Sequence, residues 1–177
     1  MKTDKSPTIK KKTTLKRFLL TRTIYYVLPN AFLNFIIAYA SFHELGYTHF
    51  FSGTQNLARL TLPMAIFLPV ILTIDITKRV TAAAEEGTIE FMVDNKLNTK
   101  KFMTKFSILH GVISGLLVLS LLVFAQYKFS TNYKLDAMAM AILVGALAGI
   151  LSVLSVYLPV NKLRKYLYKP FPANTSE

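Results

Sequence analysis

The sequence predicts an all-α polytopic membrane protein, with four transmembrane helices in an antiparallel bundle and kinks in helices 1 and 2. The chain of 177 residues is 53% hydrophobic and 17% charged, with a mean hydropathy of +0.41. That balance is more apolar than soluble domains carry. Four apolar stretches are also each long enough, at about 1.5 Å per residue, to cross a hydrocarbon core of about 30 Å. The predicted spans are residues 24–42, 58–77, 106–127 and 137–160.

The distribution of basic residues predicts orientation. The net charge is +12, and all but three of the 21 Lys and Arg residues lie in residues 1–22, 78–105 and 162–169. Only Arg59, Lys128 and Lys134 fall on the other side of the spans. The positive-inside rule therefore predicts that both termini are cytoplasmic, in a bacterial-type plasma (inner) membrane. Basic clusters between apolar spans also favour anionic lipid headgroups over nucleic acid as a partner.

The chain divides into one membrane domain, residues 15–166, between two tails. Residues 1–14 are expected to form a disordered basic tail, and residues 167–177 a frayed one. Residues 15–22 place Leu15, Phe18 and Leu19 on one helical face, which predicts an interfacial lead-in turn before the first span.

The first span carries Pro29, which predicts a kink, and then Asn30 and Asn34. The two amides lie four residues apart on one helical face, and facing lipid would leave their hydrogen bonds unmade. We therefore expect this face to point toward other helices. It acts either as an interhelical hydrogen-bond staple or as a site that contacts a solute.

The second span contains Asp75, together with Pro63 and Pro69, which predict an irregular helix. An unpaired charge within a span costs about 3 kcal/mol, so an intramembrane carboxylate is a functional candidate. We expect a polar cluster in the cytoplasmic half of the membrane, in which Asn30, Asn34 or His110 holds Asp75. The alternative is an ion pair at the interface. The members of the predicted cluster are Asp75, Asn30, Asn34, Thr73 and His110, and the basic residues available for the alternative are Lys78, Arg79 and Lys105.

Residues 78–105 form the predicted inner loop. Its alanine run is expected to extend the second helix as far as Gly87, and Asn98 or Thr99 to cap the third. Four carboxylates lie in this loop, but no Glu-x-x-His pair accompanies them, so we interpret them as a solvated face rather than a metal site. They are Glu85, Glu86, Glu90 and Asp94.

The third and fourth spans each contain a Gly-x-x-x-Gly pattern, and a short outer turn joins them as a hairpin. Two glycines one turn apart allow helix backbones to approach closely. The sequence therefore predicts tight packing of these faces, either with each other or across a homodimer. The residues concerned are Gly111, Gly115, Gly145 and Gly149.

No catalytic, metal or cofactor motif accompanies these features, and the absence of cysteine excludes disulfides and thiolate chemistry. The sequence predicts no enzymatic activity and no cofactor. Two functions remain open. The chain is either a transporter or channel subunit with a polar site in the cytoplasmic half of the membrane, or a non-catalytic accessory or regulatory subunit. Its expected partners are the bilayer with its anionic headgroups and either a second copy of the chain or another membrane protein.

Overall fold

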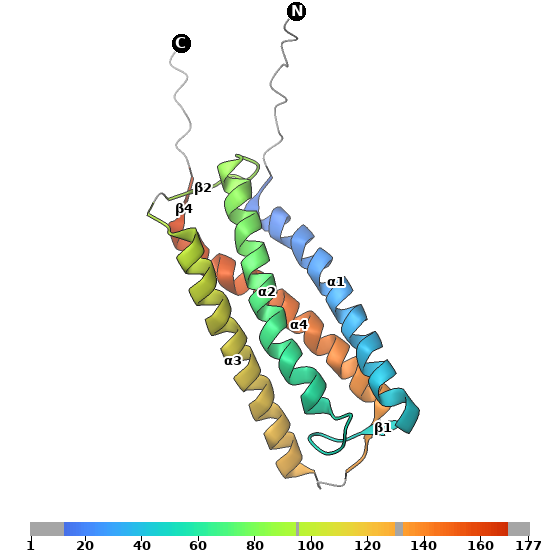
Figure 1. Ribbon diagram of the computed structural model, residues 1–177. Coiled ribbons are helices and arrows are strands. Elements are labelled where there is room, and N and C mark those ends of the chain that lie inside the picture. The colour runs from blue at the N-terminus through green and yellow to red at the C-terminus, as the bar shows by residue number, and fades with distance from the viewer. Residues whose placement is uncertain (1–12, 95, 130–132, 170–177) are drawn as a thin grey trace, which may run out of the picture.

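The computed structural model describes residues 13–94, 96–129 and 133–169. Four long helices dominate it: α1 (Leu15–Phe42), α2 (Leu57–Glu85), α3 (Thr99–Lys128) and α4 (Ala137–Leu163) (Figure 1). All four are long and apolar enough to cross a membrane, and they pack against one another. The predicted all-helical fold, with four helices long and apolar enough to span a membrane, is confirmed.

Short elements tie the loops together at the two ends of the helices. After α1 come the 3-10 helix η1 (His43–Leu45) and β1 (Tyr47–Thr48), which pairs with β3 (Leu135–Asp136) just before α4. After α2, β2 (Met92–Val93) pairs with β4 (Leu167–Tyr168), which follows η2 (Arg164–Tyr166) at the end of α4. We call these two regions the β1–β3 end and the β2–β4 end. A bridge between Thr13 and Ile89 places the start of α1 at the β2–β4 end.

A side chain caps the first turn of every long helix. Thr14, Asn56, Asn98 and Asp136 each accept a hydrogen bond from the backbone N–H three residues further on. Asn98 was one of the two caps predicted for the third helix. Because Ser, Thr, Asn and Asp oxygens satisfy N–H groups that the helix leaves unpaired, these four residues fix where the helices begin.

The helices extend beyond the predicted spans at the β2–β4 end. The expected lead-in turn is part of α1, and α2 continues along the alanine run to Glu85, close to Gly87, whose φ is +67°. Leu167 and Tyr168, the first residues of the predicted C-terminal tail, form β4; the predictions for residues 1–12 and 170–177 lie outside the described residues. Pro29, Pro63 and Pro69 lie inside α1 and α2, and kinks there stay a prediction.

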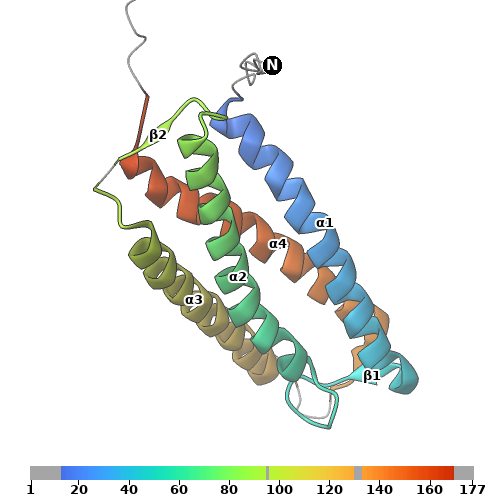
Figure 2. The ribbon, with the colours of Figure 1, turned by 45° about the horizontal axis from the view of Figure 1, so that its top comes forward.

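The helices are arranged in the order α1, α4, α2, α3, and the assembly is open rather than closed. α4 packs extensively on α1 and also on α2, while α3 packs on α2. In contrast, α3 barely touches α4, and α1 barely touches α2. Figure 2 shows α4 crossing behind α2 and reaching α1, with α3 on the far side of α2. We call the two lines of weak contact the α1–α2 seam and the α3–α4 seam.

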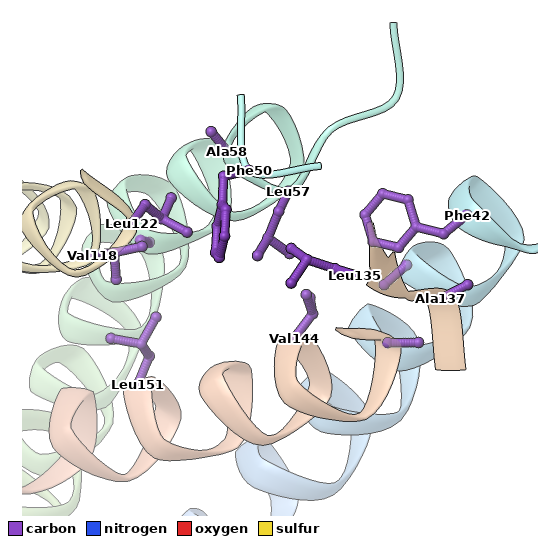
Figure 3. Close-up of a cluster of buried hydrophobic side chains, with 13 residues drawn as sticks. Phe42, Phe50, Leu57, Ala58, Val118, Leu122, Leu135, Ala137, Val144 and Leu151 are labelled. Carbon is purple, nitrogen blue, oxygen red and sulfur yellow. The ribbon is translucent and has the colours of Figure 1, made fainter. Parts of the chain in front are cut away.

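Two hydrophobic clusters, one at each end, form the core. At the β1–β3 end, Leu57, Leu135 and Val144 point toward one another, with Phe42 beside them (Figure 3). At the other end, the buried side chains come from α1, α2, α4 and the loop residue Ile89. Only 6% of the most apolar stretch of α1 is buried inside the structure, against 44% for α4. The helix α4 is therefore central, and α1 lies at an edge.

The predicted glycine faces lie where helices approach closely, but each faces a different helix. A Cβ added at Gly111 would lie 2.7 Å from the Ile66 carbonyl oxygen of α2, and one at Gly115 would lie 2.5 Å from Ile66 Cγ1. A Cβ at Gly145 would lie 2.9 Å from the Ala31 carbonyl oxygen of α1. The glycines of α3 therefore pack on α2, and those of α4 pack on α1, rather than on each other.

Alanine at these glycines should affect stability differently, according to whether the new Cβ would meet a backbone oxygen of the neighbouring helix. A Cβ at Gly149 would lie 3.7 Å from its nearest neighbours, an ordinary contact. We expect Gly111→Ala and Gly145→Ala each to destabilise the fold by about 1–3 kcal/mol, because a backbone oxygen cannot move aside as a side chain can. Gly149→Ala should be neutral or stabilising, because alanine is the better helix former.

Thermal or denaturant unfolding of the purified variants in detergent measures the difference, with Leu116→Ala on the exposed face of α3 as a second control. Equal stability of the Gly111 and Gly149 variants would contradict the assignment of close backbone contact.

Candidate functional site

Asp75 is bonded to one residue of its own helix and one of α1. Its Oδ2 atom accepts a hydrogen bond from Arg79 Nε at 2.8 Å and another from the Tyr26 hydroxyl. Residues four apart share a helical face, so Arg79 reaches the carboxylate from the next turn of α2. Asp75 therefore forms an ion pair, the alternative to the expected polar cluster, and Arg79 is its cation. Among the described residues, Asp75 accepts hydrogen bonds from Tyr26 and Arg79. The partners expected from the sequence were Asn30, Asn34 or His110.

The ion pair borders the α1–α2 seam and is only partly covered. The side chains of Arg79 and Asp75 are 45% and 37% exposed. A second guanidinium, that of Arg22 on α1, lies near enough to act on the carboxylate electrostatically. A charged group within a span is normally paired or directed to water, and here the compensation comes from the fold itself.

In the part of the chain that the structure describes, the side-chain amides of Asn30 and Asn34 bond within α1 and form no staple to another helix. Asn30 Nδ2 donates to the Tyr26 carbonyl at 2.7 Å, and Asn34 Nδ2 donates to the Asn30 carbonyl at 2.8 Å. Both amides thus bond back to their own helix, as short polar side chains can do one turn away. Together with Tyr26, which reaches Asp75 of α2, they are spaced four residues apart along α1.

Thr73 and His110 form a separate contact between α2 and α3. Thr73 Oγ1 lies 2.9 Å from His110 Nδ1, and both side chains are buried. Within the described part of the chain, His110 Nε2 is buried without a hydrogen-bond partner. Whichever ring nitrogen carries the proton, one buried polar atom of this imidazole is left unsatisfied.

The predicted cluster therefore separates into two sites on opposite sides of α2. Helical residues two positions apart do not face each other, so Thr73 and Asp75 point in different directions. Thr73 points into the α2–α3 interface, and Asp75 points into the α1–α2 seam. The sequence predicted one cluster around Asp75, whereas the Thr73–His110 contact and the Asp75 contacts lie on different faces of α2.

Tyr26 is the functional candidate that the sequence argument missed. Its phenol makes the side-chain hydrogen bond that joins α1 to α2 in the described part of the chain. The signal was available, because Tyr26, Asn30 and Asn34 repeat every four residues. A tyrosine in an apolar span is easily taken for a lipid-facing aromatic, and only the position of α2 distinguishes the two.

The contacts of Asp75 and of Thr73 with His110 support charge compensation and helix pairing more directly than catalysis. Across residues 13–94, 96–129 and 133–169, no three His, Asp or Glu side chains gather closely enough to hold a metal ion. The groove between α3 and α4 at the β1–β3 end, about 440 Å³, has a mainly apolar lining.

Loss of the Tyr26 hydroxyl should weaken the link between α1 and α2. We expect Tyr26→Phe to lower the free energy of unfolding by about 1 kcal/mol, because it removes one hydrogen bond to a charged, partly exposed acceptor. The matched control is Tyr25→Phe, since the neighbouring Tyr25 is 66% exposed and should tolerate the change. Unfolding of both variants in the same detergent measures the difference. Equal midpoints for the two would show that the phenol contributes nothing to stability.

Comparison with protein-family models, with curated proteins and with solved structures finds no match for this chain.

Proposed function

We propose that this protein is a non-catalytic accessory or regulatory membrane subunit that acts through helix packing and its basic segments. One observation carries the proposal: the intramembrane carboxylate of Asp75 is compensated by Arg79 and Tyr26 within the fold. A transport site needs such a group available to an ion or solute, whereas a paired carboxylate fixes the position of one helix against another.

The exposed faces of α1 and α3 support the same proposal. Leu28 and Phe32 on α1 are 65% and 63% exposed, and Phe124 on α3 is 61% exposed. Such apolar faces suit lipid, and they equally suit helices of a second copy or of another membrane protein. Because close packing drives helix association in a bilayer, an edge helix such as α1 is a natural site for a partner.

A transporter or channel subunit is the second candidate. It is favoured by the row of Tyr26, Asn30 and Asn34, spaced four residues apart along α1 and beginning at the residue bonded to Asp75. A movement of α1 away from α2 would uncover the carboxylate and three polar side chains together. In this alternative, the Asp75–Arg79 pair is the closed state of a polar path.

Both candidates share one topology, with antiparallel spans in a plasma membrane and both termini in the cytoplasm. Arg59, Lys128 and Lys134 belong to the β1–β3 end, while the other basic residues belong to the β2–β4 end or the adjoining tails. Topology reporters fused after Lys134 and after Glu177 should report opposite sides, with the second in the cytoplasm. The same side for both fusions would overturn this topology.

Ion flux separates the two functions. Purified protein in proteoliposomes should give no proton, potassium or chloride flux above that of protein-free vesicles. Asp75→Asn should give the same result, because the proposed role of Asp75 is to pair rather than to conduct. A flux that wild type supports and Asp75→Asn abolishes would replace the accessory proposal with the transport candidate.

Photocrosslinking tests the partner face directly. A diazirine side chain at Leu28 should yield a discrete protein adduct in native membranes, either a dimer or a larger heteromeric product. The matched control is Leu19, which lies on the same helix but is 4% exposed, and it should crosslink only within the chain. Adducts with lipid alone at Leu28 would contradict a partner on α1.

A further inference from the structure

At the β2–β4 end, the α3–α4 seam opens into a groove of about 350 Å³. Three lysines line it: Lys105 from α3, Lys162 from the last turn of α4 and Lys165 from η2. The rest of the lining is aromatic or aliphatic, and no acidic side chain contributes to it. We call this feature the basic groove. We call its three lysines the rim of the basic groove and its aromatic and aliphatic side chains the floor.

The three lysines are exposed, and no ion pair involves them in the described part of the chain. The ion pairs that are described join Arg79 to Asp75 and Lys169 to Glu90. Three ammonium groups around one groove repel each other, and they are most favourable when an anion lies between them. The rim of the basic groove therefore fits a negatively charged group.

The floor is built from aromatic rings that hold one another in place. The rings of Phe102 and Phe106 stack in parallel at 5.7 Å, and the ring of Tyr166 meets Phe102 edge-on at 6.2 Å. Leu109, about one turn further along α3, completes the apolar part of the lining. This rigid, apolar surface suits a hydrocarbon chain better than a hydrated ion.

The α3–α4 seam continues from this floor into the apolar part of the span. The two helices diverge toward the β1–β3 end (Figures 1 and 2), where the second groove is lined by Val118, Leu122 and Leu147 among others. Leu109 and Val118 are about 14 Å apart along α3, at about 1.5 Å per residue. One acyl chain covers about half of the hydrocarbon core, or about 15 Å, so it can extend from the first groove to the second.

We propose that the basic groove binds the phosphate headgroup of an anionic phospholipid, with an acyl chain in the α3–α4 seam. Three lysines in a lining that contains no carboxylate favour a headgroup of net negative charge over a zwitterionic one, whose own cation they would repel. The lipid then fills the line along which α3 fails to contact α4, and so it completes the helix assembly.

Lipid binding to the purified protein tests the proposal, with phosphatidylglycerol as the probe. Native mass spectrometry in detergent should show saturable binding of long-chain phosphatidylglycerol, with at least tenfold weaker binding of phosphatidylcholine. Replacing Lys105, Lys162 and Lys165 together with Gln should weaken phosphatidylglycerol binding at least tenfold. All three lysines are on the surface, and we expect the variant to fold.

The matched control replaces Lys16, Lys78 and Lys96 with Gln, which removes the same charge from exposed positions outside the basic groove. This variant should bind phosphatidylglycerol as the wild type does. An equal loss in both triple variants would reduce the effect to general attraction and overturn the site. Inorganic phosphate that binds the groove as tightly as the long-chain lipid would also overturn it, because the acyl chain would then contribute nothing.

Discussion

The close approach of helix backbones at Gly111 and Gly145 is the constraint on which the rest of this fold depends. In a bilayer, apolar side chains gain little by leaving lipid for protein, so helices associate through close packing and through polar contacts. Gly111 lets α3 approach the backbone of α2 at Ile66, and Gly145 lets α4 approach α1 at Ala31. The two contacts fix two pairs of helices, and the α2–α4 interface then joins the pairs.

This order of packing explains why two seams remain weak. α4 is surrounded on two sides, and its buried surface consists largely of small residues such as Ala141, Ala148 and Ser152. α1 and α3 each use one face for a single neighbour, so neither closes onto the next helix in the chain. The α1–α2 seam is bridged by the Tyr26–Asp75 hydrogen bond, and the α3–α4 seam is bridged by no comparable contact in the described part of the chain.

The sequence was sufficient for the number of helices and for several of their ends, because hydropathy and capping residues are local signals. Asn98 caps α3, and α2 continues along the alanine run to Glu85, close to Gly87, as we expected. The helices are longer than the predicted membrane spans, because hydropathy marks only the apolar portion of a helix, and Lys, Arg and Glu can continue it beyond that portion. Long-range packing decides which helices contact each other. A Gly-x-x-x-Gly pattern does not specify the helix on which it packs.

The candidate site was predicted less well than the fold, for a physical reason. From the sequence we expected Asn30, Asn34 and Asp75 to find their partners on other helices. Asn30, Asn34, Thr61 and Ser152 instead bond to the carbonyl one turn earlier in their own helix. That solution is open to any short polar side chain. A carboxylate has no hydrogen to donate when it is ionised, so Asp75 instead accepts hydrogen bonds from other side chains, Arg79 and Tyr26.

The same distinction applies to the basic residues and gives the net charge of +12 two different roles. Arg79 lies four residues from Asp75, and its fixed fork of donors lets it hold the carboxylate of its own helix. The lysines of the basic groove lie on two different elements, α3 and the end of α4 with η2, and they have no acidic neighbour in its lining. Charge that the fold compensates internally stabilises helix pairing, whereas charge that it leaves uncompensated at the membrane surface is available to lipid. The position of each basic side chain relative to the nearest carboxylate, more than the total charge, decides which of these roles it has.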